Sequence, residues 1–305
     1  MLSGAIARII EHTSLPLTQI DRLTSRHLRY SHNGAFSSEL LGFFYASLEL
    51  GKRTEAKDVK IKKTALGLAC SNTIFPMVMP FASEKIQKLH DQIENWPSLS
   101  EAQRRSVEIH WRRVKLKPRL CFCPECFKEQ ILKYGENYWK LIWQLPLADV
   151  CEIHGCPLME TSLPVNRRAE LHTPLEINEA EYQSLKTDKH SALLTQTISD
   201  LLANRTVTQR AKWRDIFVAL AKDAGVTDFK IHIRRNGIFV ASKTLAERGK
   251  VFWGEQWLSQ NFPGMLYKHC FQLGNYWLTY LILAKSLNAD ISLTDLLQNT
   301  SNDKR

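Results

Sequence analysis

The sequence lacks a hydrophobic segment long enough to cross a membrane. Its longest apolar run, Tyr276–Ala284, supplies about half of the ~20 residues that a transmembrane helix requires. A secretory signal is also missing, because Arg8 interrupts the short apolar start and no basic region precedes it. We therefore expect a cytoplasmic protein that keeps its seven cysteines reduced and makes no membrane contact.

Motifs of the common catalytic classes are absent as well. The chain contains no His-Glu-x-x-His, no Gly-rich phosphate loop and no Gly-x-Ser-x-Gly elbow, and no His stands two residues before a Glu as zinc deaminases require. Asp149 and Glu152 are expected to be solvated rather than general bases. We predict that the protein is not an enzyme. A nuclease or recombinase stays as an alternative, although spacing does not assemble its magnesium ligands.

Acidic residues are fewer than basic ones, and the excess is clustered. Forty-one Lys and Arg face 31 Asp and Glu, a net charge of +10. Between residues 104 and 119 a single acid, Glu108, accompanies seven basic residues. Such a surface attracts nucleic acid without choosing a sequence, although it can also be a solvated helix face. A second basic cluster, at 52–63, fits nucleic-acid binding and a solvated helix face equally well. From the first cluster we predict DNA contacts by Arg112, Arg113, Lys115 and Lys117.

Two short motifs, one with two cysteines and one with a cysteine and a histidine, form the strongest signal in the sequence. Cys-Pro-Glu-Cys at 123–126 is followed, after a spacer of 24 residues, by Cys-Glu-Ile-His at 151–154. Two residues within each pair let the backbone form a tight knuckle that directs both side chains at one ion. A disulfide or a coincidence remains the alternative. The motif predicts one structural Zn²⁺ ion, closed to water by four ligands: Cys123, Cys126, Cys151 and His154.

The remaining cysteines lie outside this motif. Cys121 and Cys156 flank the ligands, whereas Cys70 and Cys270 are distant in the sequence. We expect each to be a small buried side chain rather than a fifth ligand.

Apolar periodicity predicts a mainly α-helical protein. We expect a helical N-terminal domain at 1–118, a small zinc module at 119–160, a polar connector at 161–190, a helical C-terminal domain at 191–297, and a disordered tail at 298–305.

The C-terminal domain contains a pattern typical of a helix-turn-helix. Ala221 would allow close packing, Gly225 would take the turn, Val226 would anchor the core, and Thr227 would cap a second helix running from 228 towards 237. The same spacing also occurs where two core helices simply join. If the unit binds DNA, the contacts would come from Thr227, Lys230, His232, Arg234 and Arg235.

Residues Leu120–Leu158 resemble the zinc module of the TniQ/TnsD family of transposition target-selection proteins. Weaker similarity extends to Leu2–Arg8, Thr73–Phe81 and Trp213–Arg235. The matching elements of the module are the two knuckles, Tyr134-Gly135-Glu136, Tyr138-Trp139, Gln144-Leu145-Pro146, and Gly155 with the following Pro157-Leu158.

The resemblance implies a target selector of a Tn7-like transposon that performs no chemistry. One surface would bind double-stranded target DNA, or a CRISPR effector in some systems, and another would recruit an AAA+ ATPase regulator of transposition. The N-terminal helical part, roughly to Lys117, would dock the regulator. The four predicted ligands match the family's zinc ligands, and Tyr138 and Trp139 would pack the module's core.

Three departures from the family pattern affect this interpretation. The chain starts inside the family's opening helix, carries Trp143 where many relatives have His, and ends without the long helical region of members that bind a fixed attachment site. A shorter adaptor, perhaps a homodimer that receives its target from a partner, is therefore a comparable alternative. Outside the family, the alternative is a zinc-stabilised helix-turn-helix transcription regulator that binds no ATPase.

Overall fold

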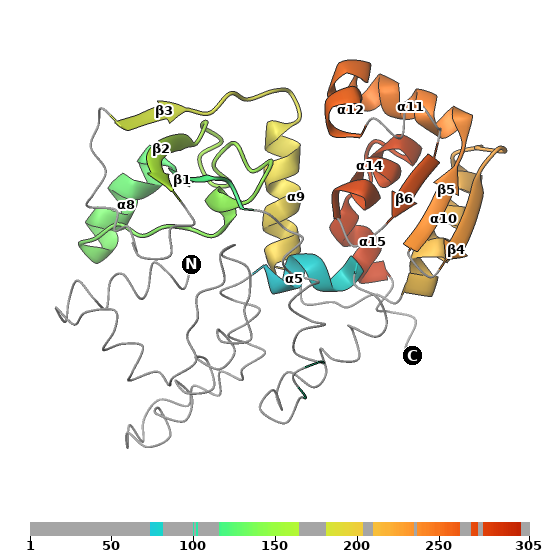
Figure 1. The fold of residues 1–305 in the computed structure, drawn as a ribbon, viewed down its shortest axis with the longest axis horizontal. Helices are drawn as coiled ribbons and strands as arrows, with labels where there is room; N and C mark the ends of the chain where they lie inside the picture. The colour runs from blue at the N-terminus through green and yellow to red at the C-terminus, as the bar shows by residue number, and fades with distance from the viewer. Residues whose placement is uncertain are drawn as a thin grey trace. The chain divides into compact units, whose positions relative to one another are not determined.

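The structure is a computed structural model that describes residues 74–81, 100, 102, 116–164, 181–203, 210–234, 237–262, 270–273 and 277–299 (Figure 1). Helices predominate among its elements, which confirms the mainly helical class. Two three-stranded antiparallel sheets accompany them, and neither sheet was predicted from the sequence. Among the described helices, none combines the length and apolar character of a membrane span.

The chain divides into two compact units that alternate along the sequence. The first contains residues 1–75 and 89–203, and the second contains residues 76–88 and 204–305. The predicted N-terminal domain, 1–118, lies largely outside the described residues. Its best-described segment, 76–81, belongs to the second unit.

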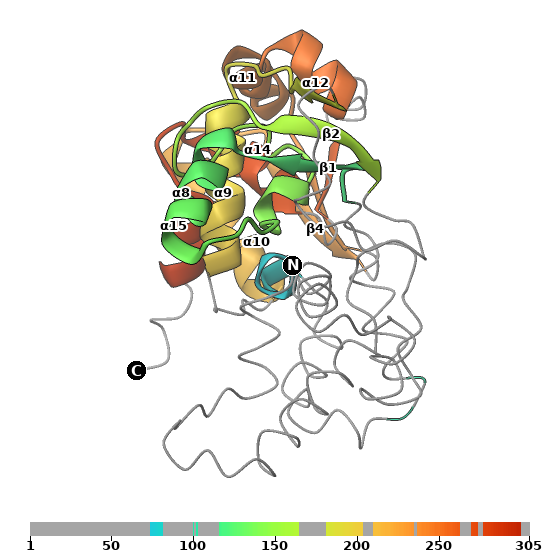
Figure 2. The same cartoon turned by 90° about the vertical axis from the view of Figure 1, so that its left-hand side faces the viewer.

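The first unit is a small sheet joined to helices (Figures 1 and 2). Strand β2 lies in the centre, with β1 and β3 antiparallel on either side. The sheet extends beyond the predicted zinc module into the predicted connector, of which 165–180 lie outside the described residues. The elements are β1 (Arg119–Phe122), α8 (Pro124–Tyr134), η3 (Ile142–Gln144), β2 (Met159–Pro164), β3 (Tyr182–Ser184) and α9 (Ser191–Ala203).

Helix α8 begins and ends with strong local signals. Cys123 is its N-cap, with extended backbone angles, and Pro124 occupies the first helical position, where its missing N–H costs nothing. Gly135 ends the helix in the left-handed conformation, at φ 75°, and donates its N–H to the carbonyl of Ile131. The first knuckle is therefore held at a defined helix start.

Aromatic side chains form the core beside this helix. Phe122 of β1 stacks on Phe127 of α8 with ring centroids 4.6 Å apart, and Trp139 and Trp143 pack against Phe127 at 5.6 and 5.8 Å. Trp139 is buried, as the family resemblance implied, whereas Tyr138 is half-buried. The knuckles thus rest on a compact hydrophobic base.

A buried glutamine completes the free edge of β1. The Gln144 side chain accepts from the backbone N–H of Cys121 at 2.9 Å and donates to the Cys121 carbonyl at 2.7 Å. One side-chain amide thereby replaces a neighbouring strand, so the edge keeps its hydrogen bonds away from water.

The second unit combines a sheet with several helices. Strand β5 lies in the centre, with β4 and β6 antiparallel on either side, and α10 and α14 pack against β4 and β6. Its elements are α5 (Phe75–Val78), which starts at the last residue of the first unit, η1 (Met79–Phe81), α10 (Arg210–Asp223), β4 (Lys230–Arg234), β5 (Gly237–Ala241), α11 (Lys243–Trp253), α12 (Glu255–Asn261), β6 (Cys270–Leu273), α14 (Trp277–Leu287) and α15 (Leu293–Asn299).

An aromatic cluster ties distant parts of the sequence together in this unit. Trp213 of α10 stacks on Phe217 and on Phe81, and Tyr280 of α14 contacts all three rings. The Trp213 indole N–H donates to the carbonyl of Pro80 at 3.1 Å. The segment before the zinc motif is therefore a core element of the C-terminal unit.

The predicted second helix of the helix-turn-helix is wrong. Gly225 makes the expected turn at φ 65°, and Ala221 and Val226 are buried, but the chain then enters β4 and not a helix. The reason is visible in residues 230–234, Lys-Ile-His-Ile-Arg, where polar and β-branched residues alternate with the period of a strand. Asp228 instead supports the start of α11, because its carboxylate accepts from Oγ of the N-cap residue Ser242 at 2.6 Å and from two backbone N–H groups of the first turn.

The predicted disordered tail, 298–305, begins with helical residues in the structure. Helix α15 continues to Asn299, so residues 298 and 299 of the predicted disordered tail are helical. The rest of the tail lies outside the described residues.

Candidate metal centre

The four predicted ligands come from two knuckles of the first unit. Cys123 and Cys126 belong to the start of α8, and Cys151 and His154 belong to a tight turn. In that turn the Cys151 carbonyl accepts from the Gly155 N–H at 2.9 Å, and Gly155 has a φ of 65° that a larger residue would adopt only with strain. Both knuckles are therefore fixed by backbone structure.

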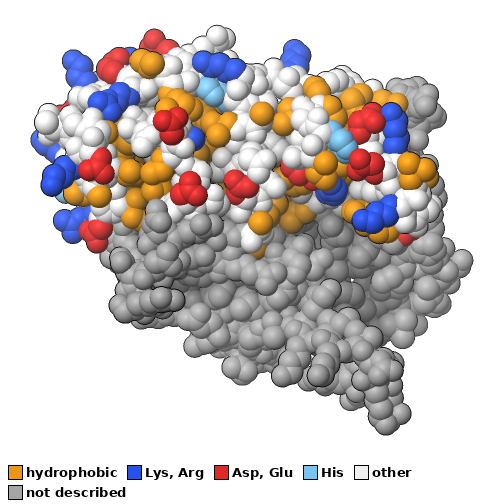
Figure 3. Space-filling view, turned by 180° about the vertical axis from the view of Figure 1, so that it is seen from behind, with side chains coloured by type: hydrophobic (Ala, Val, Ile, Leu, Met, Phe, Trp, Pro, Cys, Tyr) orange, Lys and Arg blue, Asp and Glu red, His pale blue; other side chains and the backbone are white. Residues whose placement is uncertain are grey.

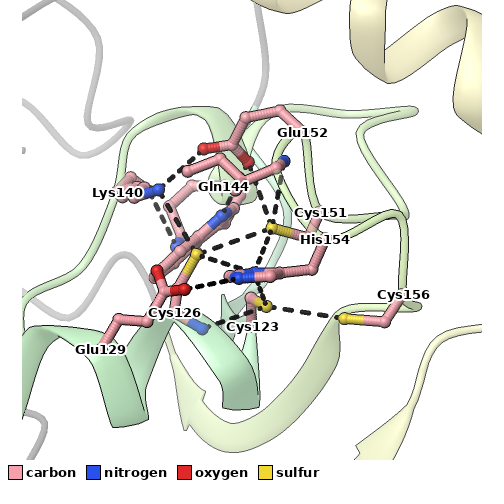
Figure 4. Close-up of polar contacts among 11 residues, drawn as sticks. Cys123, Cys126, Glu129, Lys140, Gln144, Cys151, Glu152, His154 and Cys156 are labelled. Atoms are coloured by element: carbon pink, nitrogen blue, oxygen red, sulfur yellow. Dashed lines mark hydrogen bonds and ion pairs between the residues drawn. The ribbon is translucent and has the colours of Figure 1, made fainter.

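The structure brings the four ligand atoms together. All lie within 4.8 Å of one another. His154 Nδ1 is 3.4 Å from the sulfurs of Cys123 and Cys126 and 3.6 Å from that of Cys151, and the Cys126 and Cys151 sulfurs are 3.6 Å apart (Figure 4). Tetrahedral zinc bonds would separate sulfur pairs by ~3.8 Å and sulfur–nitrogen pairs by ~3.5 Å. The cluster could hold a metal ion, and the cysteines are free thiols.

The histidine ring is oriented by a partner on its far side. His154 Nε2 lies 3.0 Å from Glu129 Oε1, so Nδ1 is the nitrogen that faces the sulfurs. A carboxylate that accepts the second ring N–H is the usual support of a metal-binding imidazole, because it fixes both tautomer and orientation. The sequence pattern alone did not identify Glu129.

Backbone amides also point at the ligand sulfurs. Cys126 N–H donates to the Cys123 sulfur and Ile153 N–H donates to the Cys151 sulfur, each at 3.4 Å. These hydrogen bonds favour the negatively charged form of sulfur that a metal needs.

Burial acts in the opposite direction. Removal from water is the main cause that raises the pKa of the thiols of Cys123, Cys126 and Cys151 above the ordinary value. A bound cation reverses this, since coordination deprotonates a thiol outright.

The two flanking cysteines behave differently. Cys121 is fully buried, and burial raises its pKa to about 11, as expected of a small core side chain. Cys156 is half-exposed and its sulfur lies 3.5 Å from the Cys123 sulfur, so the prediction that it is buried is wrong. Cys156 does not belong to the group of four mutually close ligand atoms.

The match to a known family runs through this cluster. The TniQ family model matches residues 2–158, which include all four ligand positions and more than half of the chain. The chain belongs to the TniQ family. Over 173 residues it is 24% identical to the Escherichia coli protein named "Transposon Tn7 transposition protein TnsD", an alignment that covers 55% of this chain and 34% of that relative. The chain thus spans about a third of the length of that relative.

The second unit lies mostly beyond the TniQ match, which ends at residue 158. It carries the other predicted DNA contacts. Thr227 is exposed in the turn after α10, and Lys230 and His232 are exposed on β4. Arg234 ends that strand opposite Gly237. Four predicted residues, Arg112, Arg113, Lys115 and Arg235, lie outside the described residues.

Lys117, one of the predicted DNA contacts, forms structural contacts inside the module. Its ammonium forms an ion pair with Asp149 at 3.1 Å, donates to the carbonyl of Ala148, and leaves the side chain 10% exposed. These partners engage its charge within the module, and its contact with DNA stays a prediction.

Glu152 is also not the solvated acid that was expected. Its side chain is 13% exposed and bonds to Lys140 and Trp143. Asp149, which pairs with Lys117, is 27% exposed. The sequence offered no periodic signal for these contacts, because they join residues 9 to 32 positions apart through the turn structure.

Proposed function

We propose that this TniQ-family protein is a non-catalytic target-selection adaptor of a Tn7-like transposon. It binds double-stranded DNA and recruits an AAA+ ATPase regulator to that DNA. The observation that carries the proposal is the family match through residue 158 together with the similarity to a transposition protein of Tn7.

In this proposal the metal centre holds one structural zinc ion. Three sulfurs and an imidazole nitrogen are the donor set of closed zinc sites, whose fourth position is not left to water. Zinc would join the two knuckles and fix the short turn at 151–156, and it would supply no step of a reaction. Purified chain should contain one zinc per molecule, and Cys123→Ser should lose it.

The proposed DNA surface is the β4–β5 hairpin of the second unit. Lys230 and His232 are exposed at alternate positions of β4, whereas Val240 of the neighbouring strand is fully buried on the opposite face. Arg234 occupies the next alternate position on the strand. Since some DNA-binding proteins use the strands of a sheet in a DNA groove, this face can present basic groups to DNA without a recognition helix.

The charges around the hairpin support this assignment. Strands β4, β5 and β6 contain no Asp or Glu. Figure 3 shows acidic and basic side chains interspersed over one face of the described residues. The hairpin also lies beyond the TniQ match, so it suits a role in choosing a target that differs between members.

A random duplex tests this surface, because phosphate contacts do not depend on sequence. Lys230→Ala combined with Arg234→Ala should weaken binding and lower the slope of log K against log salt by about 2. Lys128→Ala combined with Lys133→Ala, on exposed positions of α8, is the control of equal charge. Equal slopes for both double variants would remove the hairpin from the proposal.

Recruitment is tested by capture of the AAA+ ATPase of the same transposon on immobilised chain, with and without DNA. The predicted docking region, 1–118, lies mostly outside the described residues, so the capture uses the whole chain. Binding of DNA without the ATPase would instead favour the transcription-regulator alternative. If neither partner binds at moderate salt, the proposed function fails.

A further inference from the structure

A lysine and a glutamate link the two knuckles of the metal centre. Lys140 Nζ lies 2.9 Å from Glu152 Oε1 and 3.4 Å from the sulfur of Cys126 (Figure 4). Cys126 belongs to the first knuckle, and Glu152 lies within the second, between Cys151 and His154. One ammonium group therefore contacts both halves of the site.

Trp143 holds this pair in place. Its indole N–H donates to Glu152 Oε2 at 3.1 Å, and the Lys140 ammonium lies 5.1 Å from the centroid of its ring. The side chains of Lys140 and Glu152 are only 20% and 13% exposed, and Trp143 is fully buried. An ion pair so enclosed is screened less by salt than a surface pair, and its geometry is fixed by neighbours.

The charge of a loaded site explains what such a lysine would do. Three thiolates exceed the two positive charges of a zinc ion by one, so the loaded shell is negative. An ammonium that donates to one of these sulfurs stabilises that negative charge in a partly buried environment. Groups that support metal ligands in this way change metal affinity by about 10–100-fold.

We propose that Lys140 is a positioning residue of the metal centre, which retains the ion by a charge-assisted hydrogen bond to Cys126. Glu152 and Trp143 keep its ammonium at the sulfur. This inference rests on the proposed zinc site and adds to it a residue outside the ligand motif.

The test compares zinc retention in the full-length chain. Zinc-loaded protein is mixed with an excess of a chelating dye, and the release rate and competition affinity are measured. Lys140→Met should bind zinc on the order of 10-fold or more weakly, Lys140→Arg should stay close to the unchanged protein, and Glu152→Gln should fall between them. Lys128→Met is the control, because Lys128 also pairs with a glutamate at 2.9 Å but is 69% exposed.

Cobalt substitution separates this role from a purely structural one. Loss of a hydrogen bond to a thiolate raises the energy of the sulfur electrons, so the sulfur-to-cobalt charge-transfer band should move to lower energy in Lys140→Met. If that variant does not fold, as judged by circular dichroism, Glu152→Gln decides by the same two measurements.

The outcomes are distinguishable. Unchanged chain without bound zinc contradicts the proposed metal site itself. If the unchanged chain, Lys140→Met and Glu152→Gln bind zinc with equal affinity and give equal cobalt spectra, the metal site stands and the role of Lys140 is overturned.

Discussion

The glutamine that completes the edge of β1 provides the sharpest test of the fold around the metal centre. Gln144→Met keeps the side-chain length but removes both hydrogen bonds to the backbone of Cys121, at 2.9 and 2.7 Å. It also removes the donor to the Lys140 carbonyl at 3.2 Å. Each of the two Cys121 groups, buried without a partner, costs about 1–3 kcal/mol, so we expect a loss of about 4 kcal/mol in local stability.

A second buried glutamine of the same module is the matched control. Gln130 accepts from the Tyr138 N–H at 2.8 Å, but no acceptor within the described part of the chain lies within hydrogen-bond distance of its Nε2. Gln130→Met loses one bond and also removes one unsatisfied donor. The two changes are of similar size, so the net effect should be near zero.

Hydrogen–deuterium exchange with mass spectrometry measures both variants without reference to the second unit. A loss of about 4 kcal/mol should accelerate exchange of the β1 and β2 amides by about three powers of ten in Gln144→Met. Gln130→Met should exchange nearly as the unchanged protein does. Equal protection in the two variants would show that Gln144 does not replace a strand, and the argument from buried backbone groups would be refuted.

Three further predictions concern the metal, a turn and a cap. Cys123→Ser should release zinc and unfold the module, since metal binding and folding share their free energy there, and zinc content with circular dichroism measures both. Gly225→Ala should destabilise the second unit by about 1 kcal/mol in urea, because φ is 65° while a Cβ would meet no atom within 4 Å. The Ser242 hydroxyl and backbone N–H groups lower the pKa of Asp228 to about 2, so its stabilisation is present above about pH 4 and is lost towards pH 2. Asp228→Asn should therefore reduce the loss of stability measured between pH 5 and pH 2.5, and an unchanged pH profile would contradict this.

The metal cluster could be predicted from the sequence because its information is local. Two residues separate the ligands within each knuckle, a helix start fixes the first knuckle, and the left-handed Gly155 fixes the second. The distant contacts of the same site could not be predicted. Lys140 reaches Cys126 and Glu152 across 14 and 12 positions, and no spacing rule connects residues through a turn whose path is unknown.

The helix-turn-helix error has a more specific cause. Gly225 and Val226 fit a turn between helices and do take the expected turn and core positions. The alternation at 230–234 indicates a strand, but the turn that precedes it also fits a helix-turn-helix and led to the prediction of a helix. Lys230, His232 and Arg234 nevertheless occupy alternate positions of β4, which lie on one face of a strand. The predicted set of basic DNA contacts is therefore compatible with a strand.

The TniQ match and the compact units do not coincide, and their difference shows how the protein is organised. The match ends at residue 158, yet it includes the segment around Pro80 and Phe81, whose partners Trp213 and Tyr280 lie far beyond it. If the chain ended at residue 203, Phe81 and its buried neighbours Met77, Val78 and Met79 would lose that core and expose apolar surface. Residues 76–81 of the matched sequence therefore belong to a core whose other side chains lie beyond the match. The unit that carries the proposed DNA hairpin therefore includes a segment from within the family match, residues 76–81, in addition to residues that follow the match.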